Sequence, residues 1–153
     1  MHEHPPRPRR PTRPGRRQRR LAYLATALLL ASGLVWLIAH HLLPLPEFAA
    51  RHPLEPWAMR VHGAATMFGL AVLGSVWSQH VLGAWGAGRH RRSGGTMAAL
   101  WLALALTGYG LYYLADEAWR WAVGWGHVGL GLALPAALGA HLLAVGRWRR
   151  QPA

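Results

Sequence analysis

The chain has 153 residues and a formal net charge of +12 at pH 7, which at first suggests a single basic domain bound to nucleic acid. The placement of the charge excludes that class. Eight of the 17 basic residues, all of them arginine, lie in a Pro/Arg-rich stretch before residue 21, and 52% of the chain is hydrophobic against 14% charged. The absence of cysteine excludes disulfides, thiolate metal sites and thiol catalysis.

The N-terminal part divides into a basic tail and an apolar run. We expect residues 1–20 to be disordered and to lie against anionic lipid headgroups. The run 21–43 has no Asp, Glu, Lys or Arg and is long enough to cross a bilayer core of about 30 Å. A cleavable signal peptide has a shorter apolar part, usually about 7–15 residues. The run is therefore predicted to be the first transmembrane helix.

Three further apolar runs follow. Proline, glycine and charged residues separate them, as in 44–56 and 89–95. The four expected spans are residues 21–43, 57–85, 96–115 and 119–145. We predict an all-α protein whose one membrane domain, residues 21–150, is an antiparallel four-helix transmembrane bundle without an internal repeat.

Arginine is distributed unevenly between the two sides of this bundle. Fourteen of the 17 arginines lie in the tail, the second connection and the C-terminus, whereas only Arg51, Arg60 and Arg120 lie on the other side. Positively charged segments stay on the cytoplasmic side of a membrane. Both termini are therefore predicted to be cytoplasmic, with the bilayer rather than nucleic acid as the surface that the arginines meet.

Apart from His40 and His41, which end the first span, four of the ten histidines lie within apolar spans, where an ionisable side chain is costly and commonly faces a cavity, a cofactor or another helix. His62 and His80 are 18 residues apart on the second span, and His127 and His141 are 14 apart on the fourth. At about 100° per residue, each helix presents its two histidines on one face. Because both helices run inward, His62 shares the outer half with His127. His80 shares the inner half with His141.

Two facing imidazoles can hold one haem iron from opposite sides, so we predict a haem b at each pair, with these four histidines as iron ligands. Gly69 and Gly131 lie on the same faces and would let a flat ring approach the backbone. The axial separations, about 27 Å and about 21 Å, differ, which requires a tilt, a bulge or another ligand. His40 or His41 could replace His62. Isolated histidines bonded to backbone carbonyls are the alternative interpretation.

Several motifs extend this pattern: LEPW at 54–57, HGAA at 62–65, HVLG at 80–83, RSGG at 92–95, TGYGLYY at 107–113 and GHVGL at 126–130. On these residues the chain resembles the four-helix membrane b-type cytochromes, which include the cytochrome b-five-sixty-one-like proteins and the cytochrome b subunits of formate dehydrogenases and nickel-iron hydrogenases. It is most similar to small bacterial four-span members described as a domain of unknown function. The resemblance covers residues 21–150.

The resemblance implies that the histidines are axial ligands of two b haems in a bacterial inner (plasma) membrane. These haems would carry electrons between quinone and a dehydrogenase or other redox partner. The dehydrogenase subunits place one ligand near the inner end of the first helix, where this chain has no histidine. His80 would supply that ligand here.

Two arginines complete the predicted site. Arg60 and Arg120 lie near the outer ends, where haem propionates would emerge, and guanidinium suits bidentate carboxylate binding. No catalytic residue is predicted, and the sequence leaves open whether the chain acts alone or as a subunit of a membrane oxidoreductase. The alternatives are a small transporter, which would need a carboxylate embedded in a span, and a haem-free structural or assembly protein.

Overall fold

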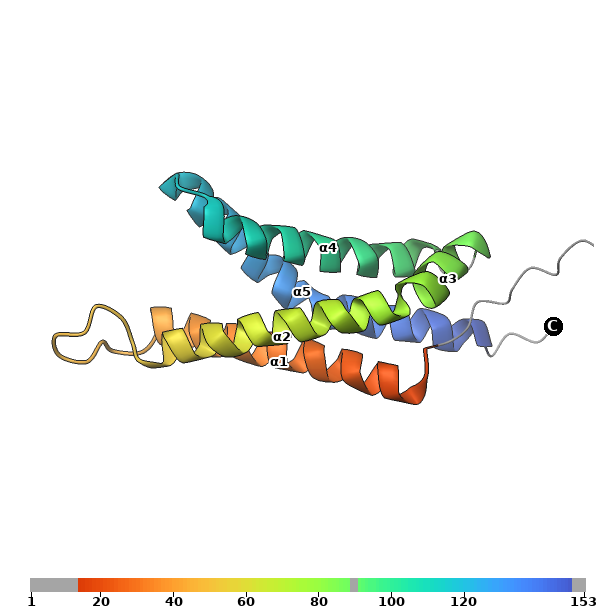
Figure 1. Cartoon of the computed structure of the whole chain (residues 1–153), viewed down its shortest axis with the longest axis horizontal. Coiled ribbons are helices and arrows are strands. Elements are labelled where there is room, and N and C mark those ends of the chain that lie inside the picture. The colour runs from red at the N-terminus through yellow and green to blue at the C-terminus, as the bar shows by residue number, and fades with distance from the viewer. Residues whose placement is uncertain (1–13, 89–90, 150–153) are drawn as a thin grey trace, which may run out of the picture.

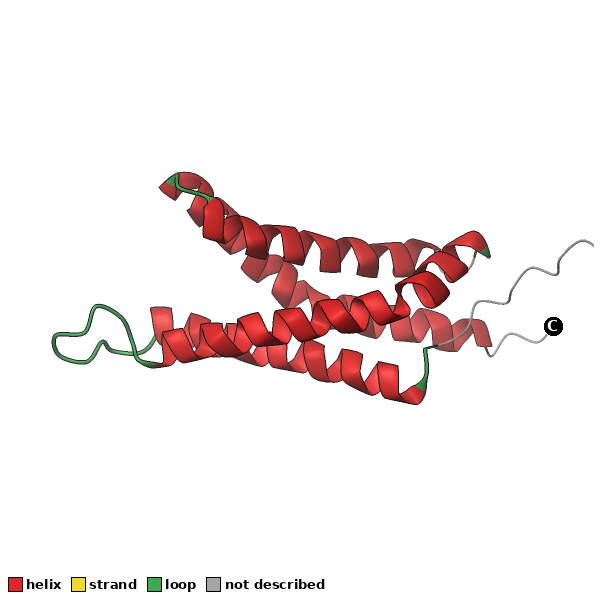
Figure 2. Cartoon of the chain, viewed as in Figure 1, coloured by secondary structure: helices red, strands yellow, loops and turns green. Residues whose placement is uncertain are grey.

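The structure, a computed structural model, describes residues 14–88 and 91–149 and is built of helices (Figures 1 and 2). In chain order the elements are α1 Arg16–His41, α2 Leu54–Val76, the π-helix η1 Trp77–Leu82, α3 Gly83–Gly86, α4 Arg91–Tyr113 and α5 Glu117–Arg149. No strand occurs among the described residues. The predicted all-α class is confirmed.

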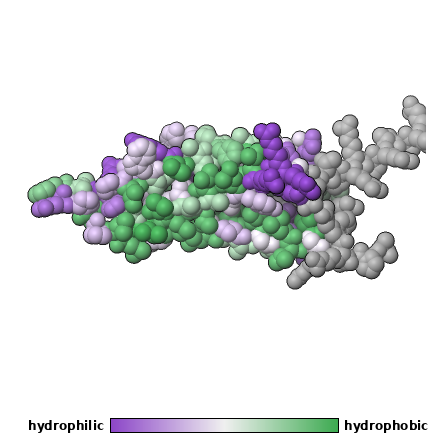
Figure 3. All heavy atoms as spheres, turned by 90° about the horizontal axis from the view of Figure 1, so that it is seen from below, coloured by the Kyte–Doolittle hydropathy of each residue, from purple (hydrophilic) through white to green (hydrophobic). Residues whose placement is uncertain are grey.

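Four helical stretches are long and apolar enough to cross a membrane: Arg16–His41, Leu54–Gly86, Arg91–Tyr113 and Glu117–Gly146. Few of their residues are buried within the protein, and large apolar side chains are exposed along each of them. Figure 3 shows apolar side chains over much of the middle of one face. Water would not stabilise so wide an apolar surface, whereas lipid would. These features indicate a multi-pass membrane protein.

The first helix begins earlier than expected. The Gly15 N–H donates to Oε1 of Gln18 at 2.9 Å, which caps the start of α1, and arginine is a good helix former. Residues 16–20, predicted to belong to a disordered tail, are therefore helical. Residues 1–13 of that tail lie outside the described residues. The third span also begins earlier than the expected residue 96, because residues 91–95 belong to the helix α4.

The four long helices form two hairpins. α1 packs along α2 and α4 packs along α5, while contacts between the hairpins are fewer and lie mainly between α1 and α5 (Figure 1). Buried residues recur every seven positions in the first hairpin: Ala25, Ser32 and Ala39 on α1, and Ala58, Ala65 and Val72 on α2. Their mostly small side chains let the two backbones approach closely.

The two ends of the bundle differ in charge. One end, here called the basic end, holds the start of α1, the connection between α3 and α4 and the end of α5 (Figure 1). The opposite end, the loop end, holds the connection 42–53 and the turn 114–116. Among the described residues, the arginines expected on the cytoplasmic side that begin α1 and α4 lie at the basic end.

Candidate functional site

The four histidines of the spans meet in two pairs. The loop-end pair consists of His62 on α2 and His127 on α5, whose ring centroids are 6.2 Å apart with an interplanar angle of 71°. The basic-end pair consists of His80 on η1 and His141 on α5, with centroids 6.4 Å apart and an angle of 77°. Each pair joins one hairpin to the other, because α2 and α5 belong to different hairpins.

Hydroxyl groups hold both rings of the loop-end pair. Ser32 Oγ on α1 lies 2.9 Å from Nδ1 of His62. Thr107 Oγ1 on α4 lies 2.8 Å from Nδ1 of His127. Each histidine is thus held by the other helix of its own hairpin.

These hydrogen bonds define the state of the imidazoles. The Ser32 hydroxyl donates to the carbonyl of Leu28 at 2.6 Å, and the Thr107 hydroxyl donates to that of Ala103 at 2.7 Å. With its hydrogen committed, each hydroxyl oxygen accepts from the histidine, so the proton of the neutral ring lies on Nδ1. Nε2 then carries the lone pair that can bind a metal.

Glycine follows each of these hydroxyl residues and gives the ring room. A Cβ on Gly108 would lie 3.2 Å from Cε1 of His127, closer than nearly all real contacts of a Cβ. A Cβ on Gly33 would lie 3.5 Å from Cε1 of His62. Ser32 and Gly33 thus form a cradle for one imidazole on α1, and Thr107 and Gly108 form a matching cradle on α4. In each cradle the hydroxyl contacts Nδ1 and the glycine leaves room for the ring.

The basic-end pair is held differently. Ser93 Oγ on α4 lies 3.2 Å from Nδ1 of His141. His80 lies within the π-helix Trp77–Leu82, beyond which α3 turns out of the line of α2 toward α4 (Figure 1). A π-helix closes i→i+5 hydrogen bonds and so advances less per residue than an α-helix. We expected a tilt, a bulge or another ligand to reconcile the unequal histidine spacings. The π-helix is such a bulge.

The spacing within each pair suits one metal ion between two imidazoles. A nitrogen ligand lies about 2 Å from such an ion. It lies about 1.1 Å from the centre of its own five-membered ring, given ring bonds of about 1.35 Å. Two rings on opposite sides of one ion therefore have centroids about 6.3 Å apart. The observed centroid distances are 6.2 and 6.4 Å.

The structure changes the interpretation of one glycine. Gly69 is buried, and a Cβ placed on it would lie 3.0 Å from Cη2 and Cζ3 of Trp101 on α4. The indole already fills the space that we expected a flat cofactor to use. Gly131 has a wider setting, with Cδ2 of Leu104 4.0 Å from a Cβ placed there. Of these two glycines, Gly131 thus keeps the wider approach to its backbone.

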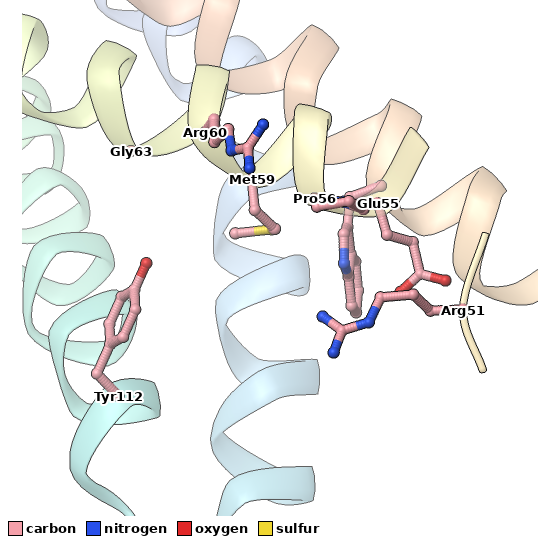
Figure 4. Close-up of a pocket in the computed structure, with 8 residues that line it drawn as sticks. Arg51, Glu55, Pro56, Met59, Arg60, Gly63 and Tyr112 are labelled. Atoms are coloured by element: carbon pink, nitrogen blue, oxygen red, sulfur yellow. The ribbon is translucent and has the colours of Figure 1, made fainter. Parts of the chain in front are cut away.

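A cavity of about 470 Å³ opens at the loop end (Figure 4). Arg51, Glu55 and Arg60 contribute its charged groups, and Tyr112 reaches it from α4. Gly63, which follows a histidine of the loop-end pair in the chain, also lines it. The cavity therefore brings two guanidinium groups to the loop-end side of that pair.

The two arginines predicted for the site differ in position. Arg60 lines this cavity, with its guanidinium carbon 4.8 Å from the ring centroid of Trp57. Arg120 is an exposed residue near the start of α5 and is not among the residues that line the cavity. The second arginine that lines the cavity is Arg51.

The other candidate histidines have different partners. Nδ1 of His40 lies 3.0 Å from Oε2 of Glu55, and its ring stacks on Trp36 with centroids 4.7 Å apart. His41 stacks on Trp125 of α5 at 5.6 Å. The structure therefore places His62, rather than either of these residues, opposite the histidine of α5. No group of three or more His, Asp or Glu side chains among the described residues could hold a metal ion.

In comparisons with known proteins, the chain matches no protein-family model, and no curated protein or solved structure is significantly similar to it. The sequence interpretation missed the cradles. A usable signal was present, since Ser32 and Thr107 each precede a glycine in the span before a histidine-bearing span.

Proposed function

We propose that the chain is a membrane b-type cytochrome that binds two haems, one between the imidazoles of each pair, and carries electrons across the membrane. The centroid distances of 6.2 and 6.4 Å carry this proposal, because two imidazoles that held one iron between them would have centroids about 6.3 Å apart. His62 and His127 hold the loop-end haem, and His80 and His141 hold the basic-end haem. Each haem, when bound, supplies a one-electron carrier.

Hydroxyl side chains orient the two histidines of the loop-end pair. Ser32 and Thr107 keep the proton on Nδ1 and leave Nε2 for the iron. A hydrogen bond from Nδ1–H also makes the ring a stronger donor. The two ligands on α5 are 14 residues apart, which separates the two sites by about 21 Å along the helix. That separation covers much of a bilayer core of about 30 Å.

The cavity at the loop end supports a further assignment. Arg60 and Arg51 lie where the carboxylates of the loop-end haem can form ion pairs, and a guanidinium binds a carboxylate through two parallel hydrogen bonds. These ion pairs would fix the direction of the haem and favour its reduced state. Arg120, the other arginine predicted for this role, is less well placed because it is away from the cavity.

The cellular setting follows from the resemblance and the arginine distribution. The basic end faces the cytoplasm of a bacterium, and the bundle lies in its inner membrane. Electrons pass to or from quinone or a redox partner, so any catalysis belongs to that site or to a partner protein. Nucleic acid is not a partner.

The first test is spectroscopic. The purified protein should show a b-type α-band in the dithionite-reduced minus oxidised spectrum and contain two haems per chain. The imidazole planes are 71° and 77° apart, so both ferric haems should give the highly anisotropic low-spin signal of crossed imidazoles in electron paramagnetic resonance. A chain that stays without haem when haem is well supplied would instead support a structural or assembly role.

The second test assigns the pairs. His80→Ala and His141→Ala should remove the same haem, and His62→Ala should remove the other one. His52→Ala is the matched control, because this residue lies in the connection at the loop end and should leave both haems in place. Loss of different haems in His80→Ala and His141→Ala would refute the pairing.

A further inference from the structure

About midway between the two histidine pairs, each long helix places one residue at a similar depth, and the residues of α1, α2 and α4 pack together. These residues are Ala25 of α1, Gly69 of α2, Trp101 of α4 and Leu134 of α5, here called the central layer. Ala25 and Leu134 are 0% and 3% exposed, Gly69 is buried and Trp101 is half-buried. Leu134 is seven residues from each histidine of α5, which places the layer about 10 Å from either pair.

The indole of Trp101 spans the gap between the two hairpins in this layer. Its Cη2 and Cζ3 atoms lie 3.0 Å from the point where a Cβ of Gly69 would be, and Cβ of Ala25 lies 3.7 Å from the same point. A side chain at position 69 would push the ring away. The other eight tryptophans lie within one turn of a histidine pair or beyond it toward an end of the bundle. Trp101 is thus the tryptophan at mid-depth.

We propose that Trp101 is a positioning residue for electron transfer between the two haems, a role that rests on the proposed function. One electron leaves the ferrous iron of one pair and reduces the ferric iron of the other, and no bond is formed or broken. The indole is neither oxidised nor reduced. It supplies the packed atoms through which the electron tunnels, and tunnelling slows steeply where a through-space gap replaces packed atoms.

A purely structural role predicts something different. An aromatic side chain in a core can be kept for its buried area alone, in which case its replacement lowers stability and leaves the transfer rate unchanged. The rate and the stability must therefore be measured on the same samples. Trp101→Phe keeps an aromatic ring and much of the volume, whereas Trp101→Leu removes the reach toward Gly69.

The experiment follows a single electron in the protein loaded with both haems. A flash-generated reductant supplies less than one electron per chain, and equilibration between the haems is followed in the α-bands. Trp101→Leu should slow equilibration by about tenfold and Trp101→Phe by about threefold. Trp121→Leu, at an exposed residue of the loop end, is the control and should change nothing. Haem content, both midpoint potentials and the thermal unfolding midpoint are measured in parallel.

The outcomes separate the two proposals. A wild-type protein without two haems overturns the proposed function and the role of Trp101 with it. Two haems with the same equilibration rate in wild type and Trp101→Phe, or a lower unfolding midpoint as the sole change, overturn the role of Trp101 alone. If Trp101→Leu does not fold, the rate in Trp101→Phe still decides.

Discussion

The cradle on α4 gives the sharpest test of the site, because one hydroxyl can be removed without changing the shape of its side chain. In Thr107→Val a methyl group replaces the Oγ1 atom that lies 2.8 Å from Nδ1 of His127. The Nδ1–H of a partly buried ring then loses its acceptor, which costs about 1–3 kcal/mol. The ring is also free to rotate away from the position that faces His62.

The size of the effect follows from these losses. Removing a hydrogen-bond partner from a metal-ligating histidine lowers metal affinity by about 10–100-fold. We therefore expect Thr107→Val to lose the loop-end haem at least tenfold faster than wild type during challenge with an excess of apomyoglobin. In the fraction that keeps its haem, the weaker donor stabilises ferric iron less, and the potential of that haem should rise by about 30–60 mV.

Thr26→Val is the matched control. Its hydroxyl makes the same type of bond to the carbonyl four residues earlier, at 2.9 Å from the oxygen of Ala22, but has no histidine partner among the described residues. It should leave haem retention and both potentials at wild-type values. If Thr107→Val behaves like Thr26→Val, or if the basic-end haem responds in its place, the assignment of the cradle to the loop-end haem is wrong.

Three other substitutions test the surroundings of the site. Glu55→Ala removes the hydrogen-bond acceptor of the His40 ring and of the His52 N–H just before α2. The unfolding midpoint of this variant in detergent should therefore fall by about 3–6 °C. Glu47→Ala, in the exposed connection, is the control and should not lower the midpoint. Arg60→Gln removes a positive charge beside the loop-end cavity, so a redox titration should show the potential of the loop-end haem lowered by a few tens of millivolts. An equal change in the potentials of both haems would contradict the placement of Arg60 beside the loop-end haem. Gly108→Ala puts a Cβ 3.2 Å from a ring of the loop-end pair and should lower loop-end haem content, whereas Gly110→Ala on the same helix, with nothing within 4 Å, should leave it unchanged.

The sequence predicts the helical class and the membrane helices because length and apolar composition decide them. A run without charged residues such as 21–43 can satisfy its backbone in lipid only as a helix. The boundaries are less predictable, because they depend on local contacts. The bond between Gly15 and Gln18 starts α1 at Arg16, inside the arginine run that composition alone assigns to a tail.

Periodicity also predicts which histidines share a face and a depth, but not how the two helices reconcile their spacings. The π-helix at residues 77–82 shortens the eighteen-residue spacing on one helix and so brings it closer to the fourteen-residue spacing on the other. No side chain in that segment marks it as π-helical, since the extra residue is accommodated by packing against the rest of the bundle. The exchange of Arg120 for Arg51 beside the cavity depends likewise on the path of the connection 42–53.

The two cradles show why a repeat can be present in the structure and absent from the sequence. In each hairpin the first helix carries a hydroxyl residue and a glycine, Ser32 with Gly33 or Thr107 with Gly108, and the second helix carries the histidine that they hold. The hydroxyl and the histidine are 30 residues apart in the first hairpin and 20 in the second. The longer connection 42–53 accounts for most of this difference, and it prevents an alignment of the two halves at one fixed period. The two hairpins thus carry the same device without a detectable sequence repeat, and each contributes one imidazole to the loop-end pair.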